Sequence, residues 1–185
     1  MTRWVHKNQG FTVVELLIVI VVIAILAAIT VVAFNGIQIR AQTSKVVSSA
    51  DAVIKSLEMY KLDNGAYPLS GSDYYCIGRE ENYPPVDAFG SGSCMSISGN
   101  INMARVNTAF NNLIQKYISS IPDGSITPTI ESDTYGERGL YYHANSFQPN
   151  NAYLYYRLPG DIACPKGEKR NWYLGMTACE IKLGP

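Results

Sequence analysis

Residues 11 to 34 read FTVVELLIVIVVIAILAAITVVAF, and this stretch decides the fold. Its only polar side chains are Thr12, Glu15 and Thr30, and none lies between Leu16 and Ile29. A helix over these residues is about 36 Å long, which is enough to cross the roughly 30 Å hydrocarbon core of a bilayer with some tilt. The sequence therefore predicts one membrane-spanning helix near the N-terminus.

An ordinary membrane anchor or an uncleaved secretory signal is the first alternative for this stretch. The apolar region of such a signal is usually about 7 to 15 residues long and ends at small residues. Ala24 to Ala28 offers small residues, but Ile29 to Phe34 continues the apolar pattern beyond them. Cleavage inside the apolar stretch is therefore not expected.

Glu15 is the feature that a plain membrane anchor does not explain, because a carboxylate inside a membrane segment is costly. It lies four residues after Phe11. Phe11 in turn follows Gly10 and a short polar leader that contains Arg3 and Lys7. One interpretation places the Glu15 carboxylate at headgroup level or at the helix N-terminus, where the helix macrodipole tolerates it.

The segment from Gly10 to Leu17 reads G-F-T-V-V-E-L-L, between a short basic leader and a long apolar helix. In this combination it resembles the N-terminus of type IV prepilins and of the related pseudopilins. The resemblance implies cleavage between Gly10 and Phe11 by a membrane-embedded prepilin peptidase, methylation of the new Phe11 amine, and helical polymerisation of the product. Physical chemistry agrees, since the Glu15 carboxylate of one subunit can neutralise the Phe11 ammonium of a neighbour inside an apolar bundle.

The composition of the whole chain fits one membrane segment and one domain of ordinary size. There are 185 residues, 15 basic and 15 acidic side chains, and 47% apolar residues. Removal of residues 1–10 deletes Arg3 and Lys7, so 15 minus 2 leaves 13 basic against 15 acidic residues, a net charge of minus 2. No specific nucleic-acid partner is predicted, because a mildly acidic surface does not favour phosphate binding.

All four cysteines, Cys76, Cys94, Cys164 and Cys179, follow the apolar stretch. An even number suits disulfides outside the cytoplasm, so the body is predicted to be extracytoplasmic and the leader cytoplasmic. Of the three possible pairings, the local one is favoured, which joins Cys76 to Cys94 and Cys164 to Cys179. A zinc site is the alternative, but the sequence has no C-x-x-C pair and the spacings are wide.

After Ile37 the apolar residues recur at helical spacing, so one long helix from Phe11 to about Leu62 is predicted. An apolar stripe on its second half is expected to pack against the domain. Asn64-Gly65 supplies the stop signal. Residues 59–68 read M-Y-K-L-D-N-G-A-Y-P, which resembles the helix exit of pilins and especially of major pseudopilins. Asn35-Gly36 is the weak point inside the helix and the candidate for a bend.

The rest of the body is predicted to mix loops, a short helix and strands. Residues 69–100 are rich in Ser, Gly, Pro, Asn and Tyr and are predicted to form a long loop, and residues 102–118 a second helix. Strands are predicted at residues 140–143, 152–158, 172–174 and 179–183. The alternation in residues 152–158 predicts one sheet face on the long helix and one in contact with solvent or a neighbour.

The sequence contains few candidate residues for catalysis or for metal or nucleic-acid binding. His143 is the only histidine after residue 10, and in a tyrosine-rich strand a structural role is favoured over a catalytic dyad. A calcium site, as in some pseudopilins, is one interpretation of the acids Asp123, Glu131 and Asp133. Their spacing matches no calcium loop, however, so these side chains are expected to be solvated. The basic cluster at residues 166–170 is expected to be a solvated loop. No enzyme, metal or cofactor is predicted.

Thirteen tyrosines, eight of them in residues 117–173, are more than packing requires. Tyrosine suits surfaces that become buried only on assembly.

The predicted fold is therefore α+β and pilin-like: a long N-terminal transmembrane and spine helix packed on a small antiparallel sheet with disulfide-tied loops. The predicted parts are a leader (1–10), a transmembrane segment (11–36) and an extracytoplasmic domain (37–185). The predicted function is a structural subunit of a type IV pilus, used for adhesion, motility or DNA uptake.

The expected partners are copies of the same chain, prepilin peptidase and the pilus assembly platform. The chain is expected to lie in the inner membrane before assembly and in an extracellular filament afterwards. The alternatives are a pseudopilin of a type II secretion or competence system and an anchored adhesin or enzyme domain that never polymerises.

Overall fold

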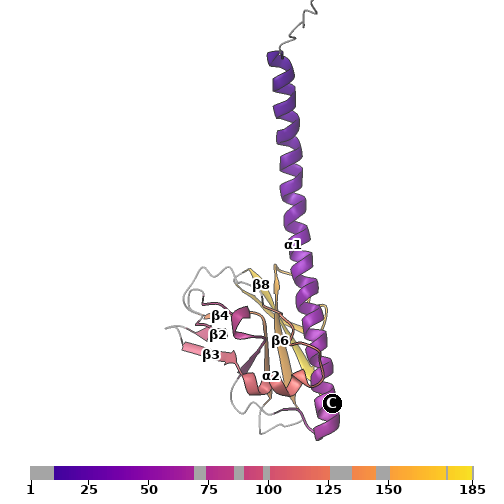
Figure 1. Ribbon diagram of the computed structural model, residues 1–185, viewed down its shortest axis with the longest axis vertical. Coiled ribbons are helices and arrows are strands. Elements are labelled where there is room, and N and C mark those ends of the chain that lie inside the picture. The colour runs from indigo at the N-terminus through magenta and orange to yellow at the C-terminus, as the bar shows by residue number, and fades with distance from the viewer. Residues whose placement is uncertain are drawn as a thin grey trace, which may run out of the picture. The chain divides into compact units, whose positions relative to one another are not determined.

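The computed structural model describes residues 11–68, 74–85, 90–97, 101–125, 135–144, 151–173 and 175–184. The chain divides into two compact units, Met1–Gln38 and Ile39–Pro185. Helix α1 (Val13–Asn64) begins in the first unit and continues into the second (Figure 1). The prediction of one long helix is confirmed, with each end shifted by two residues.

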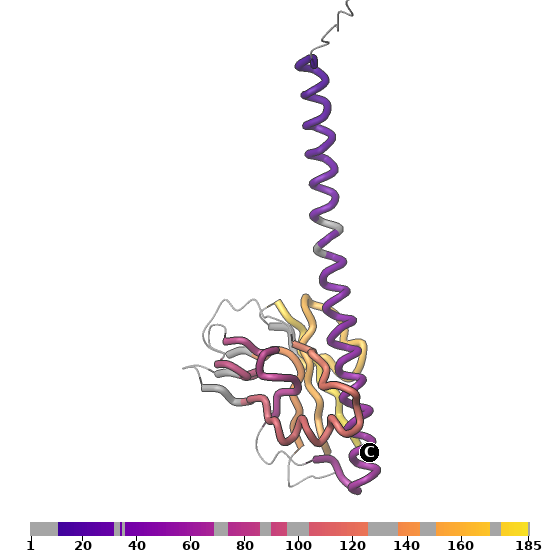
Figure 2. Tube along the Cα trace, viewed as in Figure 1, coloured from indigo at the N-terminus to yellow at the C-terminus, as the bar shows by residue number. Residues whose placement is uncertain are grey.

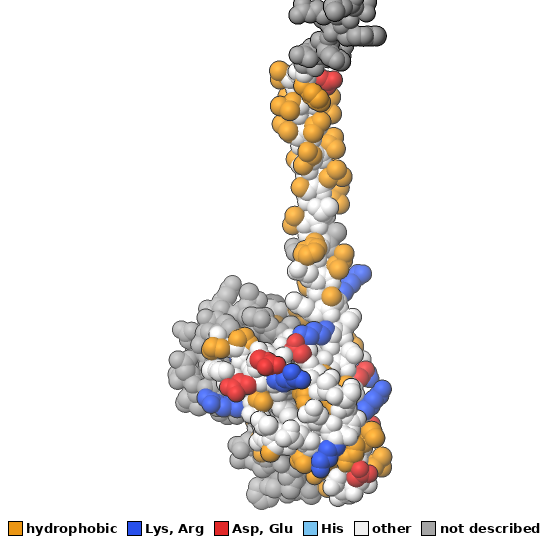
Figure 3. Space-filling model, viewed as in Figure 1, with side chains coloured by type: hydrophobic (Ala, Val, Ile, Leu, Met, Phe, Trp, Pro, Cys, Tyr) orange, Lys and Arg blue, Asp and Glu red, His pale blue; other side chains and the backbone are white. Residues whose placement is uncertain are grey.

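In the first unit, α1 is apolar on all sides. None of the side chains described between Phe11 and Gln38 is buried, and Figure 3 shows apolar side chains along this part of the helix. By length and composition α1 contains one segment that is able to cross a membrane. A helix that is apolar all round needs lipid or other apolar helices around it.

In the second unit, α1 supplies one wall of the core. Val46, Ala50, Val53 and Leu57 are buried, and their spacing places them on one helix face. This apolar stripe packs against side chains of the sheet and of a short helix, α2 (Thr108–Gln115). Gly65, at φ 79°, follows the last turn, and its N–H donates to the Lys61 carbonyl, so the predicted stop is confirmed.

Among the described residues the strands form one eight-stranded sheet in the order β4-β2-β3-β1-β5-β6-β8-β7. The strands are β1 (Tyr74–Ile77), β2 (Ser93–Ile97), β3 (Ile101–Val106), β4 (Tyr135–Glu137), β5 (Leu140–Ala144), β6 (Ala152–Pro159), β7 (Glu168–Tyr173) and β8 (Met176–Leu183). All neighbours are antiparallel except β1 and β3. Figure 2 traces how β1 lies beside β5, although many residues separate them in the chain.

The prediction of a long loop at residues 69–100 is wrong where the structure describes that segment. It contains β1, a short 3-10 helix η1 (Glu80–Asn82) and β2. The run Tyr74–Ile77 consists of residues that suit strands, and it gains partners on both sides, β3 and β5, from distant parts of the chain. Long-range pairing therefore overrides the loop-like composition around it.

The second helix is shorter than predicted. Residues 101–106 form β3, with Val106 paired to Cys76 of β1. The helix begins only after Asn107, whose side chain accepts a hydrogen bond from the Phe110 N–H at 2.9 Å. Met103 and Val106 have a spacing that also fits a helix, so periodicity alone assigned them wrongly.

The two faces of β6 differ from the prediction in one respect. Leu154, Tyr156 and Leu158 lie in the core with α1, as predicted. On the opposite face, however, Tyr155 and Arg157 are also buried, with exposed fractions of 9% and 6%. That face carries a second apolar cluster, which contains Cys76, Tyr83, Cys94, Tyr141 and Tyr155. The face is therefore partly covered within the chain rather than open to solvent or a neighbour.

The last two strands are longer than predicted. β7 begins at Glu168, so the basic cluster at residues 166–170 lies partly on a strand instead of in a loop. β8 begins at Met176 and pairs with both β6 and β7. Leu174, Pro149 and Asn150, which the sequence placed in a strand and a hairpin, lie outside the described residues.

Candidate processing and assembly site

The first turn of α1 is closed by a capping box between Thr12 and Glu15. The backbone N–H and the hydroxyl of Thr12 both donate to Oε2 of Glu15, at 2.8 and 2.7 Å. In return, the Glu15 N–H donates to the Thr12 hydroxyl at 3.2 Å. This reciprocal pair satisfies backbone donors that a helix N-terminus otherwise leaves unpaired.

The capping box explains how an isolated subunit tolerates Glu15, because the carboxylate has local donors and lies at the positive end of the helix dipole. This is the geometry that the helix-terminus interpretation requires. It uses only one carboxylate oxygen: Oε1 accepts no hydrogen bond from the residues that the structure describes. Glu15 is exposed, so Oε1 is open to a cation from outside the chain.

Phe11 and Gly10 flank the predicted cleavage position. The Phe11 side chain is 80% exposed. Gly10 lies outside the described residues. Thr12 is the residue of this site that sequence reasoning missed, although the pattern T-V-V-E at residues 12–15 is a capping-box signature.

Two disulfides close loops of the second unit. Cys76 of β1 is bonded to Cys94 of β2, and Cys164, which precedes β7, is bonded to Cys179 of β8. This is the sequence-local pairing. Cys76, Cys94 and Cys179 are buried, whereas Cys164 is partly exposed. With all four cysteines bonded, none is available for a Cys/His dyad or for zinc.

Asp123, one of the acids considered for calcium, forms an ion pair with Lys45 of α1 at 2.6 Å and accepts hydrogen bonds from Ser125. Partial burial alone raises the pKa of Asp123, but the hydrogen bonds from Lys45 and Ser125 outweigh it and hold that pKa below its usual range. Glu131 and Asp133 lie outside the described residues. Within the described residues, no group of three His, Cys, Asp or Glu side chains is placed to hold a metal ion.

The charged side chains of the basic cluster have acidic partners. Lys166 pairs with Asp51 of α1 and Lys169 with Asp161. Arg170 pairs with Glu180 at 2.7 Å. These positive charges are therefore paired with acidic side chains within the chain.

The tyrosine-rich face of the sheet holds His143. Its ring stacks on Tyr74 with 4.5 Å between the ring centroids. Tyr141 and Tyr155 stack on each other at 4.8 Å, and Tyr74 meets both of them edge-on. Several of the tyrosines thus pack within the domain, and His143 belongs to their cluster.

A long helix that begins at a processing motif and packs its second half on a disulfide-tied α+β domain defines a pilin-like protein. The prokaryotic N-terminal methylation motif matches residues 5–31. The type IV wide pilus major component PilA4 of Thermus thermophilus is 33% identical over 95 residues, which are 49% of this chain and 72% of that protein. The chain belongs to the type IV pilin and pseudopilin family, a family of structural subunits.

Type II secretion system core proteins G are also similar. The protein from Escherichia coli (strain K12) is 36% identical over 86 residues, 46% of this chain and 59% of its own length. The protein from Klebsiella pneumoniae is 41% identical over 65 residues, 35% of this chain and 46% of its own length. The chain thus spans about half the length of these relatives. The comparison with solved structures found no match.

Proposed function

We propose that this protein is the structural subunit of a type IV pilus and polymerises through the N-terminal part of α1. The main support is the apolar surface of α1 between Val13 and Gln38, where every side chain whose burial the structure describes is exposed, with one carboxylate near its start. Lipid covers such a surface before assembly, and the helices of neighbouring subunits cover it afterwards.

Processing creates the positive charge that pairs with the Glu15 carboxylate. Cleavage between Gly10 and Phe11 leaves an ammonium, or a methylated ammonium, on Phe11. Oε2 of Glu15 still accepts hydrogen bonds from Thr12. Oε1 forms an ion pair with the Phe11 ammonium of a neighbouring subunit. An unpaired charge in an apolar bundle is costly, so this pairing favours the correct stagger of subunits.

The proposed arrangement in the cell follows from these parts. Residues 1–10 form the cytoplasmic leader, residues 11–36 cross the inner membrane, and residues 37–185 form the domain outside the cytoplasm, where disulfides persist. Prepilin peptidase removes the leader, and the pilus assembly platform moves the subunit from the membrane into an extracellular filament. No catalytic role, cofactor or nucleic-acid partner is proposed.

A pseudopilin of a secretion or competence system is the second candidate. Several of the similar proteins are named type II secretion system core protein G, and the helix exit M-Y-K-L-D-N-G-A-Y-P also favours this role. Both candidates share the fold, the processing and the membrane helix, so these features do not separate them.

Deletion of the gene in its own host separates the two candidates. The pilin proposal predicts that surface filaments disappear in electron micrographs while the set of secreted proteins stays unchanged. Filaments that persist together with a loss of secreted proteins would establish the pseudopilin role instead. Complementation with the unaltered chain is the control for both readouts.

A further inference from the structure

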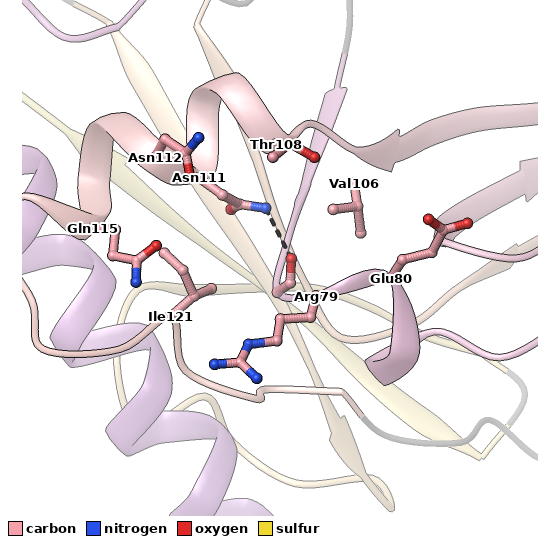
Figure 4. Close-up of a pocket in the computed structure, with 9 residues that line it drawn as sticks. Arg79, Glu80, Val106, Thr108, Asn111, Asn112, Gln115 and Ile121 are labelled. Carbon is pink, nitrogen blue, oxygen red and sulfur yellow. Dashed lines mark hydrogen bonds between the residues drawn. The ribbon is translucent and has the colours of Figure 1, made fainter.

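A polar pocket lies in the second unit between η1 and α2 (Figure 4). Its volume is about 260 Å³. The residues that line it are Gly78, Arg79, Glu80, Val106, Thr108, Asn111, Asn112, Gln115 and Ile121. None of them belongs to the processing site or to a disulfide.

The lining combines several groups that donate and accept hydrogen bonds with two small apolar side chains. Asn112 and Gln115 supply two exposed side-chain amides from one helix, and Thr108 supplies a hydroxyl. Figure 4 shows these side chains on α2, with Arg79 and Glu80 on the opposite wall. Arg79 is paired with Glu81 at 3.3 Å, and Glu80 accepts from the Ser91 hydroxyl at 3.1 Å. Both charges thus have partners within the chain, so the lining does not select a charged ligand.

Asn111 fixes the back of the pocket. Its side chain is 5% exposed, and Nδ2 donates to the Gly78 carbonyl at 2.8 Å. Oδ1 of the same amide has no hydrogen-bond partner among the described residues. Oδ1 is itself shielded from solvent, so it lies behind the lining. Asn111 therefore supports the wall of the pocket and is not one of the groups offered to a ligand.

We propose that this pocket binds one neutral sugar residue, such as the terminal residue of a glycan. The planar amide, guanidinium and carboxylate groups each present two adjacent polar atoms, which suits neighbouring hydroxyls on a sugar ring. Val106 and Ile121 provide an apolar contact for the C–H face of the ring. No aromatic side chain lines the pocket, so a nucleobase has no ring on which to stack.

The size of the pocket supports a small ligand. Sites for drug-sized molecules usually have volumes of about 300 to 1,000 Å³. The present pocket lies just below this range, which suits a single ring and not a longer oligosaccharide. Sugar binding goes beyond the proposed role as a filament subunit and does not depend on polymerisation.

The test uses the full chain in a phosphocholine detergent, because the headgroups of alkyl glycosides are themselves sugars. Saturation-transfer NMR is recorded with glucose, galactose, mannose and N-acetylglucosamine, each at millimolar concentration. We expect at least one of them to receive saturation. The double variant N112A/Q115A is expected to bind that sugar about tenfold more weakly, because it loses hydrogen bonds from two amides.

The substituted residues are exposed on α2, and alanine favours a helix, so the variant is expected to fold. Lys116→Ala is the matched control, since Lys116 is exposed directly after α2 but does not line the pocket. It is expected to bind the sugar as the unaltered chain does.

Absence of saturation for all four sugars overturns the proposal, and so does undiminished binding by the double variant. Binding of glycine, a zwitterion used as a further probe, in place of every sugar would overturn the assignment of a neutral ligand. None of these outcomes bears on cleavage at Gly10-Phe11 or on filament formation, so the two proposals fail separately.

Discussion

At the scale of single residues, we propose that Glu15 has two tasks that use different oxygen atoms. Oε2 closes the first turn of its own helix through Thr12. Oε1 accepts no hydrogen bond from the described residues and is the atom that we propose for a cation from another chain. A role in helix capping alone requires only the first oxygen. The two tasks can be separated by substitution, because one depends on hydrogen-bond acceptance and the other on negative charge.

Substituting Glu15→Leu should leave membrane insertion unchanged or slightly improved, since it removes a charge from an apolar helix. Filament formation should fall by about tenfold or more, because the Phe11 ammonium then enters the bundle without a countercharge. Quantitative immunoblots of membranes and counts of surface filaments measure the two effects. Normal filament numbers with normal processing at Phe11 would show that the carboxylate is incidental.

Glu15→Gln is the informative companion to that variant. Its side-chain oxygen can still accept from Thr12, so the capping box is expected to persist, whereas the negative charge is lost. We expect assembly to fail in Glu15→Gln as it does in Glu15→Leu. Filaments that form with glutamine but not with leucine would assign the requirement to capping and not to charge pairing.

Thr12 is expected to act through the helix start. Thr12→Val keeps the shape of the side chain but removes the hydroxyl that donates to Glu15 and accepts from its N–H. Loss of such a cap typically costs a helix about 0.5 to 2 kcal/mol. Hydrogen exchange of the amides in the first turn should become faster in Thr12→Val and stay unchanged in Thr12→Ser. Unchanged exchange in both variants would mean that the box does not form in the membrane.

At the scale of elements, α1 has one internal weak point at Asn35-Gly36. A Cβ atom added at Gly36 would meet no atom within 4 Å, so alanine fits there without a clash. Gly36→Ala should stabilise the helix by about 0.8 to 1 kcal/mol and slow hydrogen exchange around residue 36. Ala41→Gly, at an exposed position of the same helix, should do the opposite.

Filament formation by Gly36→Ala tests whether the helix bends at this position during assembly. We expect fewer filaments than with the unaltered chain, although the isolated helix is more stable. Equal or greater filament numbers would remove Asn35-Gly36 as the bending point.

The contact between Lys45 of α1 and Asp123 predicts an acid dependence of the domain. Because the folded state lowers the pKa of Asp123, the pair stabilises the fold above the unfolded pKa, and this contribution is lost as the pH falls through the folded pKa. Both side chains are more than 40% exposed, so solvent screening keeps the contribution below about 1 kcal/mol. Denaturant unfolding measured from about pH 6 to pH 2 should show this loss in the unaltered chain but not in Asp123→Asn. Equal pH dependence in the two chains would contradict the ion pair.

At the scale of the whole molecule, the parts that sequence could predict are those with local causes. The membrane helix, the candidate cleavage site at Gly10-Phe11 and the carboxylate at Glu15 all lie in one continuous motif. Thr12 belongs to the same motif, and its T-x-x-E signature was available. The stop at Gly65 likewise depends only on neighbouring residues.

The features that sequence could not predict depend on distant segments. β1 is a strand because β3 and β5 pair with it, and β3 is a strand although its apolar spacing also fits a helix. The burial of Arg157 requires Glu137, which arrives from β4 to form the ion pair. The pocket joins residues 78–80 to residues 106–121, so no short motif reveals it.

The two disulfides should contribute differently to the stability of the domain. They close loops of similar length, with sequence separations of 18 and 15, so the chain-entropy contribution is about 3 kcal/mol for each. Cys76 and Cys94 are both fully buried, and replacing them by serine also leaves unpaired hydroxyls in an apolar cluster. We therefore expect the Cys76→Ser/Cys94→Ser variant to lose more free energy of unfolding than Cys164→Ser/Cys179→Ser. Equal losses in denaturant titrations would contradict this difference in burial.

The intact mass of the chain in surface filaments sheared from cells tests directly whether this protein is a processed pilin. We expect the filaments to contain this chain, beginning at Phe11 with one added methyl group. Its mass should be lower by four hydrogens because of the two disulfides. Filaments that lack the chain, or a chain that remains in the membrane and still begins at Met1, would contradict the proposed role as a pilin.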